Sequence, residues 1–316
     1  MESNPQIKMW TPATIVMVVL MIIGVTIAGY RMLFGLGAAT NMNDGYPWAF
    51  WLGLDVLGGV AMAAGGFIIA CAVYIFNWKK YYVIVRPAIL TAFLGYLMAV
   101  VAIFLDIGHP FRLPNPMLMW QWHSVMWVVA MHVIFYTATL ALEFSPMVLE
   151  KLGWHKTLKA VNKIMVGAVI FGVMLSTLHQ ASLGAVFLIA PSKMSPLWWS
   201  EVMPYHFLIS AVAMGLSMVS FEAMLSKKFL HHSVDNEVFY GLARGCRNVL
   251  CFYLVVKLYQ WFVHAGIGAA FNGTIEANMF LLEMLIGVII PLVILFNKKS
   301  QTNLNTIFKV NIIVIT

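Results

Sequence analysis

The chain has 316 residues, of which 62% are hydrophobic and only 10% are charged. Its mean hydropathy of +0.87 excludes a water-soluble domain and indicates a polytopic membrane protein. The net charge of +7 comes mostly from basic residues in short connections between apolar segments. Membrane topology explains such a distribution, so nucleic-acid binding is excluded as well.

Eight apolar segments are long enough to cross a bilayer, whose hydrocarbon core needs about 20 residues per helix. We therefore expect an all-α membrane bundle that forms one domain over residues 1–316. The first segment is too long for a signal-peptide core, so we expect it to remain as helix one. The eight segments are Pro12–Ala38, Pro47–Phe76, Val83–Leu105, Trp120–Phe144, Ala160–Ala190, Val202–Leu225, Cys246–Phe271 and Ala277–Phe296.

Lysines mark every second connection between these segments, and an excess of basic residues is typical of cytoplasmic loops. The intervening connections carry only Arg112 and Lys193. We therefore expect a cytoplasmic N-terminus and place the intervening loops outside, in the periplasm of a Gram-negative cell. The lysines are Lys8, Lys79, Lys80, Lys151, Lys156, Lys159, Lys227, Lys228, Lys298 and Lys299.

In this orientation the outer half of the bundle holds most of the polar residues. Asp55 lies about two turns below the outer end of the second segment, and His179 lies in the outer half of the fifth. Groups this deep need a partner or an aqueous cavity, and a structural hydrogen bond between helices is the alternative. The outer half also holds Ser182, Asp106, His109, Trp120 and His123.

Fewer polar residues lie deeper or towards the cytoplasm. Arg86, Glu143 and Glu222 lie near inner helix ends, and Lys257 lies near mid-depth. Residues near helix ends can also simply reach the interface with their side chains. The tryptophans near Trp120 and Trp198 are most simply explained as an aromatic belt, and Gly58-Gly59 and Gly65-Gly66 as sites of close helix packing.

The histidines and cysteines are the candidate cofactor ligands of this chain. A bis-histidine haem needs two facing imidazoles at similar depth, and the histidines leave this open, although their clustering in one half favours no haem. The cysteines lack a CxxC spacing, which supports neither a disulfide framework nor an intrinsic iron-sulfur cluster. The histidines are His123, His132, His179, His206 and His264, and the cysteines are Cys71, Cys246 and Cys251.

Several sequence strings carry a family resemblance over nearly the whole chain up to the sixth segment. Arg31-Met-Leu-Phe-Gly-Leu-Gly, Asp44-Gly-Tyr-Pro-Trp and Gly53-Leu-Asp55-Val-Leu-Gly-Gly are followed by Val85-Arg86-Pro-Ala, Leu142-Glu143-Phe-Ser-Pro and Thr177-Leu-His179-Gln-Ala-Ser182-Leu-Gly. Together they resemble the HybB-type membrane subunits of periplasm-facing nickel-iron hydrogenases, within the NrfD and polysulfide-reductase membrane-subunit superfamily. The last two segments match mainly in hydropathy.

The resemblance implies a subunit of the bacterial inner membrane that exchanges electrons with the quinone pool, with menaquinone as the expected quinone. It implies two four-helix bundles, of which the second to fifth segments form the quinone pocket. The implied partners are a periplasmic four-cluster ferredoxin-like iron-sulfur subunit and a catalytic subunit such as a nickel-iron hydrogenase. Members of this family usually continue through a ninth and a tenth helix, whereas residues 307–316 supply only part of a ninth.

Quinone reduction takes up two electrons and two protons, so its site needs proton donors close to the ring oxygens. We expect Asp55 and His179 to be the catalytic pair, with Trp120, His123, Ser182, Asp106 and His109 at the quinone. Arg86, Glu143, Glu222 and Lys257 are candidates for a proton route from the cytoplasm. A haem-bearing electron conduit and a non-catalytic membrane anchor are the alternatives.

Overall fold

The computed structural model describes residues 10–43, 53–229 and 232–316, without the side chains of Ala13 and Asp55. Seven of the helices in these ranges are long and apolar enough to cross a membrane, which confirms the expected all-α membrane fold. They are Thr14–Phe34, Val56–Ile75, Lys79–Asp106, Val125–Leu152, His155–Ile189, Met203–Phe229 and Ile275–Phe296.

The seventh expected segment forms α10 (Asn236–Gln260), which begins at Asn236 rather than at Cys246. Its first half carries Glu237, Arg244 and Arg247, so this helix is long but is not among the seven. A π-helical turn, η7 (Trp261–Ala265), continues it. The count of eight spans therefore stays a prediction.

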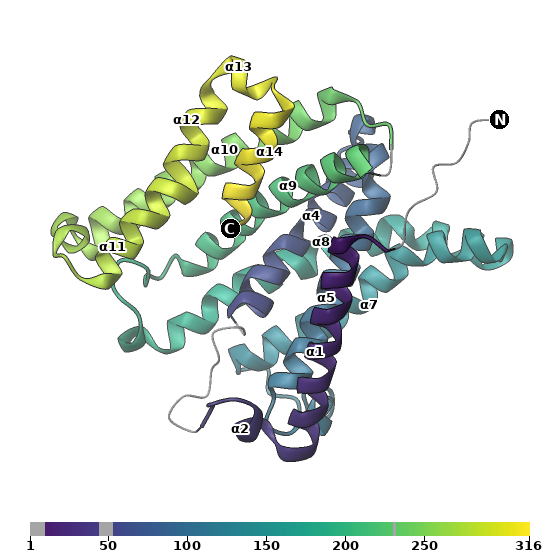
Figure 1. Cartoon of the computed structure of the whole chain (residues 1–316), viewed down its shortest axis with the longest axis horizontal. Coiled ribbons are helices and arrows are strands. Elements are labelled where there is room, and N and C mark those ends of the chain that lie inside the picture. Colours follow the sequence, from purple (N-terminus) through teal and green to yellow (C-terminus); the bar gives the residue numbers. More distant parts are fainter. Residues whose placement is uncertain (1–9, 44–52, 230–231) are drawn as a thin grey trace.

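The first bundle consists of four helices that pack side by side (Figure 1). They are α4 (Val60–Ala70), α5 (Tyr82–Asp106), α7 (Val125–Leu152) and α8 (His155–Val186). The π-helical turns η1 (Gly53–Gly59) and η2 (Cys71–Ile75) flank α4. Gly153, at a φ of 71°, ends α7 and lets the chain turn directly into α8.

Close packing by glycine holds helices of this bundle together and joins the bundle to the next helix. A Cβ atom on Gly66 would lie 2.4 Å from the Cβ of Ala92 in α5, and one on Gly65 would lie 2.7 Å from the carbonyl oxygen of Gly215 in α9 (Met203–Phe229). The packing role expected for Gly65-Gly66 is therefore confirmed, whereas the one expected for Gly58 is wrong, since a Cβ there would meet no atom within 4 Å. Because α9 packs against α4, α8 and α10, it lies between the two halves of the molecule.

In the second half, α10 and α14 (Leu304–Ile315) pack against α9, and α12 (Ile290–Phe296) packs against α10 and α14. The helix that contains α12 starts as α11 (Ile275–Leu282) and passes through a π-helical stretch, η9 (Glu283–Ile289). The short helix α13 (Lys298–Gln301) then leads into α14, whose Asn311 donates a buried hydrogen bond of 2.8 Å to the Ser220 hydroxyl of α9. These helices form a second bundle beside the first.

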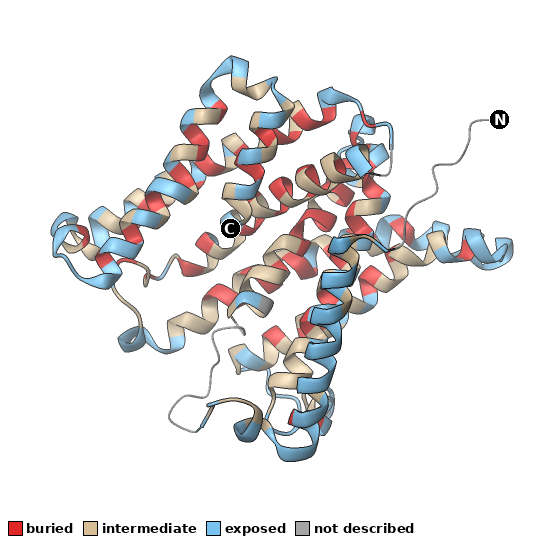
Figure 2. Ribbon diagram, in the orientation of Figure 1, coloured by how far each residue is buried: buried red, intermediate tan, exposed pale blue. Residues whose placement is uncertain are grey.

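Helix α1 (Pro12–Phe34) lies along the outside of the first bundle, and Figure 2 shows it exposed over most of its length. Only 6% of its apolar window is buried. Its one buried polar residue is Arg31. The Arg31 Nε donates a hydrogen bond of 2.6 Å to the Leu105 carbonyl, and the Arg31 Nη2 donates one to the Ile107 carbonyl. Carbonyls at the end of a helix lack partners within it, so Arg31 both caps α5 and fastens α1 to it.

We expect Arg31→Met to lower the free energy of unfolding by about 1.5–3 kcal/mol, because two carbonyls lose hydrogen bonds from a charged donor. Unfolding in detergent micelles, followed by circular dichroism, measures the change. Arg112→Met is the matched control, since that arginine is exposed in the connection after α5. Equal free energies of unfolding for the two variants would contradict the proposal that Arg31 holds α1 against α5.

Candidate functional site

A column of polar side chains runs through the core of the first bundle, between α5, α7 and α8. At its centre is His179 of α8, which is 0% exposed. Neither of its ring nitrogens has a hydrogen-bond partner among the described residues. Its ring lies 6.3 Å from that of His132 in α7, edge to face, and the Nδ1 of His132 lies 3.4 Å from the Ser182 hydroxyl. His179, His132 and Ser182 thus form one contact group.

Two tyrosines continue the column away from Ser182. The ring of Tyr96, in α5, lies 5.8 Å from the ring of His179 and 4.6 Å from that of Tyr136 in α7. Both tyrosines are fully buried, and Ser176 of α8 lies beside both of their hydroxyl groups. Three hydroxyl groups therefore gather one helical turn from His179.

Glu143 of α7 lies beyond Tyr136 and is 5% exposed. Gly172 of α8 makes room for it, since a Cβ on that glycine would lie 2.7 Å from the Glu143 Oε1 atom. Glu143, Tyr136 and His132 are spaced by seven and four residues, which places all three on one face of α7. The column thus contains carboxyl, hydroxyl and imidazole groups in sequence.

These groups are suited to proton transfer. Imidazole, carboxyl and hydroxyl groups can each give and accept a proton, and polar groups inside a membrane protein usually mark a pathway or a reaction site. A buried imidazole without a hydrogen bond calls for an explanation beyond packing. Within the described residues no group of three His, Cys, Asp or Glu side chains is arranged to hold a metal ion.

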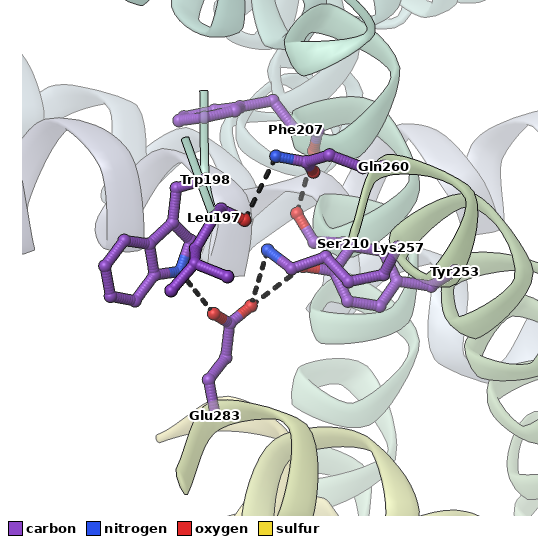
Figure 3. A network of polar contacts seen from close by, with 8 residues as sticks. All are labelled: Leu197, Trp198, Phe207, Ser210, Tyr253, Lys257, Gln260 and Glu283. Atoms are coloured by element: carbon purple, nitrogen blue, oxygen red, sulfur yellow. Dashed lines mark hydrogen bonds and ion pairs between the residues drawn. The ribbon is translucent and has the colours of Figure 1, made fainter. Parts of the chain in front are cut away.

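A second polar cluster lies in the second bundle, where α10, η9 and the connection before α9 meet (Figure 3). The Lys257 ammonium lies 3.0 Å from the Glu283 carboxylate. The same carboxylate accepts hydrogen bonds from the Trp198 indole at 2.6 Å and from the Tyr253 hydroxyl at 3.1 Å. Nearby, the Gln260 amide donates to the Leu197 carbonyl at 3.1 Å. Glu283 therefore joins three parts of the chain.

The lysine of this ion pair is more deeply buried than its partner, with 5% of its side chain exposed against 33% for Glu283. His206 of α9 packs beside the cluster, its ring 5.7 Å from that of Tyr253, and neither of its nitrogens has a partner among the described residues. Glu283 begins the π-helical stretch η9, and π-helical turns are frequent at functional sites.

The residues expected at the quinone do not all lie together. His179 and Ser182 share the column, whereas His109, Trp120 and His123 are exposed in the connection between α5 and α7. Asp106 lies at the end of α5, where it lines a groove between α1 and the first bundle. Asp55 belongs to η1, but its side chain lies outside what the structure describes.

The residues expected to carry protons are also separated. Glu143 belongs to the column, while Arg86 forms an ion pair of 2.9 Å with Glu150 in which both side chains are about half exposed. Glu222 of α9 accepts a hydrogen bond from Thr91 of α5, and Lys257 belongs to the second cluster. They do not form one continuous route among the described residues.

Sequence reasoning did not single out Tyr96, Tyr136 and Ser176 as site residues. Tyrosine and serine are common in membrane helices, so none of the three stands out by type. The seven-residue spacing from Tyr136 to Glu143 is the signal that could have identified at least that tyrosine. The sequence did not indicate that Glu283 pairs with Lys257 either, because that contact joins two separate helices.

Comparison with known proteins places the chain among related membrane subunits. The family model for polysulphide reductase NrfD matches residues 38–316. A protein of Nitratidesulfovibrio vulgaris is 43% identical over 265 residues, covering 81% of this chain and 68% of that protein. A probable Ni/Fe-hydrogenase 2 b-type cytochrome subunit of Escherichia coli is 34% identical over 283 residues, covering 88% and 72%. The integral membrane subunit of a menaquinone reductase from N. vulgaris is 30% identical over 261 residues, covering 74% and 59%.

Proposed function

The chain belongs to the NrfD family of polysulphide reductase membrane subunits, and from this membership we propose that it passes electrons between an iron-sulfur partner subunit and the menaquinone pool. The observation that carries the proposal is the buried His179, which has no hydrogen-bond partner in the part of the chain that the structure describes and lies at the centre of a polar column in the first bundle. A relative named as a menaquinone reductase subunit supports the choice of quinone. The catalytic partner is a hydrogenase-type or related oxidoreductase.

In this proposal His179 and Asp55 lie closest to the reacting quinone and exchange its protons. The rings of His132 and Tyr96 pack against the His179 imidazole and hold it in place, and Ser182 lies beside the His132 ring. His109, Trp120 and His123 line the entry on the exposed connection, and Asp106 lies at its edge. The iron-sulfur partner docks on this same end of the bundle, because electrons must reach the ring over a short distance.

The experiment that tests the proposal uses the chain assembled with its partner subunits in proteoliposomes. When the electron donor of the catalytic subunit is added under anaerobic conditions, menaquinone in the bilayer should become reduced, as followed by its ultraviolet absorbance. If the partner's iron-sulfur clusters are reduced while the quinone stays oxidised, the chain is an anchor and the proposal is wrong.

Orientation follows from the charges in the loops, and we propose that the Asp106 end of the first bundle faces the periplasm. Reporter fusions should then show cytoplasmic activity after Lys151, at the hairpin between α7 and α8, and periplasmic activity after Lys193. Periplasmic activity of the Lys151 fusion would reverse the assignment and with it the side on which the iron-sulfur partner binds.

Proton movement from the cytoplasm is a further part of the proposal. Glu143 stands at the Lys151 end of the column, and Arg86 and Glu150 form a partly exposed ion pair nearer that end of α7. A proton that enters there can pass Glu143 and the hydroxyl groups of Tyr136 and Tyr96 before it reaches His179. Glu222 and Lys257 then belong to separate polar sites rather than to this route.

A haem-bearing conduit is the second candidate function. It is favoured by the contact between the His132 and His179 rings and by the b-type cytochrome in the name of the E. coli relative. We propose that the chain carries no haem, because the ring of Tyr96 also packs against His179. A reduced-minus-oxidised spectrum of the purified complex separates the two candidates, and a stoichiometric b-type band from this subunit would favour the conduit.

A further inference from the structure

A polar pocket of about 580 Å³ lies at one end of the second bundle, where α10 begins and α13 leads into α14 (Figure 1). Its volume is within the range of small-molecule sites. None of the described residues that line it is acidic. The polar lining residues are Asn236, Tyr240, Lys299, Thr302, Asn303 and Asn305.

The side chains of this pocket present mainly hydrogen-bond donors. The Oδ1 atom of Asn236 accepts a hydrogen bond of 2.8 Å from the Lys227 ammonium, so its NH₂ group is the part that remains for a ligand. The Oδ1 atom of Asn303 accepts from two backbone N–H groups at the start of α14, which leaves its NH₂ group in the same position. The ammonium of Lys299 can only donate. Such a set of donors suits the oxygens of a phosphate group.

Positive charge extends beyond the pocket. Arg244 and Arg247 lie on the same face of α10 as the pocket tyrosine, four and seven residues after it, and Lys298 is exposed in α13. Acidic groups at this end of α10 are fewer. Glu237 lies 3.9 Å from Arg244, with both side chains more than half exposed, and Asp235 caps the helix. The surface around the pocket therefore attracts anions.

An exposed apolar surface begins directly beside the pocket. The Arg247 guanidinium lies 5.3 Å from the centre of the Phe296 ring, and Phe296 precedes Lys299 by three residues. Ile289, Val293 and Phe296 are all exposed, at spacings of four and three residues along a helix that is apolar enough to span a membrane. The pocket thus lies where the lipid-facing surface ends, which is the depth of phospholipid head groups.

We propose that this pocket binds the head group of an anionic phospholipid with a glycerol head, as in phosphatidylglycerol. The phosphate lies among the NH₂ groups of Asn236 and Asn303 and the Lys299 ammonium, and the acyl chains lie along Val293 and Phe296. Basic pockets between membrane helices on the cytoplasmic side bind such head groups. A soluble phosphate compound would use the donors but not the apolar surface beside them. The site is separate from the polar column and from the proposed electron transfer.

An isosteric exchange at Asn236 offers the sharpest test. Asn236→Asp keeps the side-chain size and the oxygen that accepts from Lys227, but it replaces the NH₂ donor with a carboxylate oxygen. Asn162→Asp is the matched control, because Asn162 is exposed in α8, outside the pocket and close in sequence to other lysines. Both variants add one negative charge, so they reduce a general attraction of anionic lipid alike.

A lysine pair tests the same site through loss of a positive charge. Lys299→Gln removes the ammonium from the pocket, and Lys156→Gln makes the same change in α8. Both lysines are exposed, and each is the second residue of its helix. Neither exchange disturbs the packing of the bundles, so this pair decides the question if Asn236→Asp does not assemble.

Lipid binding to the purified complex in detergent is measured by native mass spectrometry, with phosphatidylglycerol and with phosphatidylcholine of the same acyl chains. We expect Asn236→Asp and Lys299→Gln to weaken phosphatidylglycerol binding by at least about tenfold, equivalent to 1.4 kcal/mol. Asn162→Asp and Lys156→Gln should stay within about twofold of wild type, equivalent to less than 0.5 kcal/mol. Equal losses within each pair, or a wild type that binds both lipids equally, would overturn the assignment.

Glycerol 3-phosphate, which has the phosphate and glycerol without acyl chains, separates a lipid from a soluble ligand. It should not displace phosphatidylglycerol from the wild-type complex even in large excess. If it does, the pocket takes a soluble phosphate compound and the lipid assignment is wrong. Phosphatidylglycerol should also raise the Tm of the wild-type complex more than that of Asn236→Asp, because a ligand stabilises the folded state that binds it. An equal rise in both would contradict binding at this pocket.

Discussion

Replacing His179 with phenylalanine is expected to lower quinone-linked electron transfer by about 10²–10⁴-fold, the usual loss when a proton-exchanging side chain is removed. Phenylalanine keeps the approximate volume of the ring and its contact with Tyr96, so packing changes little. Electron transfer from the catalytic subunit to an artificial acceptor at the iron-sulfur partner should survive, because that step precedes the quinone. Asp55→Asn is expected to act in the same direction.

The control for this variant is His206→Phe in the second bundle. His206 is also buried, its ring also packs against the ring of a tyrosine, and it also lacks hydrogen-bond partners among the described residues. Both variants should therefore have similar effects on yield and thermal stability. If both lower quinone reduction equally, or if neither does in a well-assembled complex, then His179 has a structural role only, and the proton donors must be sought among Asp106, His109 and His123.

Breaking the ion pair between Lys257 and Glu283 is expected to have the largest effect on stability. Glu283→Leu leaves the buried Lys257 ammonium without its ion-pair partner and removes the hydrogen-bond acceptor of Trp198 and Tyr253. We therefore expect it to lower the free energy of unfolding by about 3–5 kcal/mol. Lys257→Met should lose less, since Glu283 is one-third exposed and keeps both of those donors. The double variant should lose less than the sum of the two single variants.

The exposed ion pair of Arg86 and Glu150 is the matched control for this cycle. Its separation is nearly the same, 2.9 Å against 3.0 Å, but both of its side chains are about half exposed. Arg86→Met should therefore change the free energy of unfolding by only about 0–1 kcal/mol. Unfolding of all variants in the same detergent measures the contrast. If Glu283→Leu and Arg86→Met lower the free energy of unfolding equally, burial does not strengthen the ion pair of Lys257 and Glu283.

Hydropathy and helix packing were the most predictable features of this chain. Runs of apolar residues specify spanning helices directly, and Gly65-Gly66 marked a close helix contact. The seventh expected segment was placed less well. The helix there starts ten residues earlier, at Asn236, because Asp235 caps it and its first turns bury Val238, Phe239 and Leu242 in the core of the second bundle.

The sequence indicated which polar residue lies at the centre of the candidate site, but not which residues contact it. His179 stood out because a histidine deep in an apolar segment is rare, whereas its neighbours Tyr96 and Tyr136 did not. The groove between α1 and the first bundle could not be anticipated at all, since it depends on how far α1 stands from α5 and α9. Arg31 illustrates the same limit, because its hydrogen bonds reach carbonyls of residues 105 and 107 that are distant in sequence.

The central claim, that the first bundle is where quinone reacts, is tested most directly by photolabelling the intact complex with a quinone that carries an azide on its ring. After illumination and digestion, mass spectrometry locates the modified peptides. We expect labels on the outer ends of α5, α7 and α8, around Asp106, His132 and His179, and we expect excess menaquinone to abolish them. Labels confined to the second bundle, around Lys257 and Glu283, or labels that menaquinone does not displace, would contradict the claim.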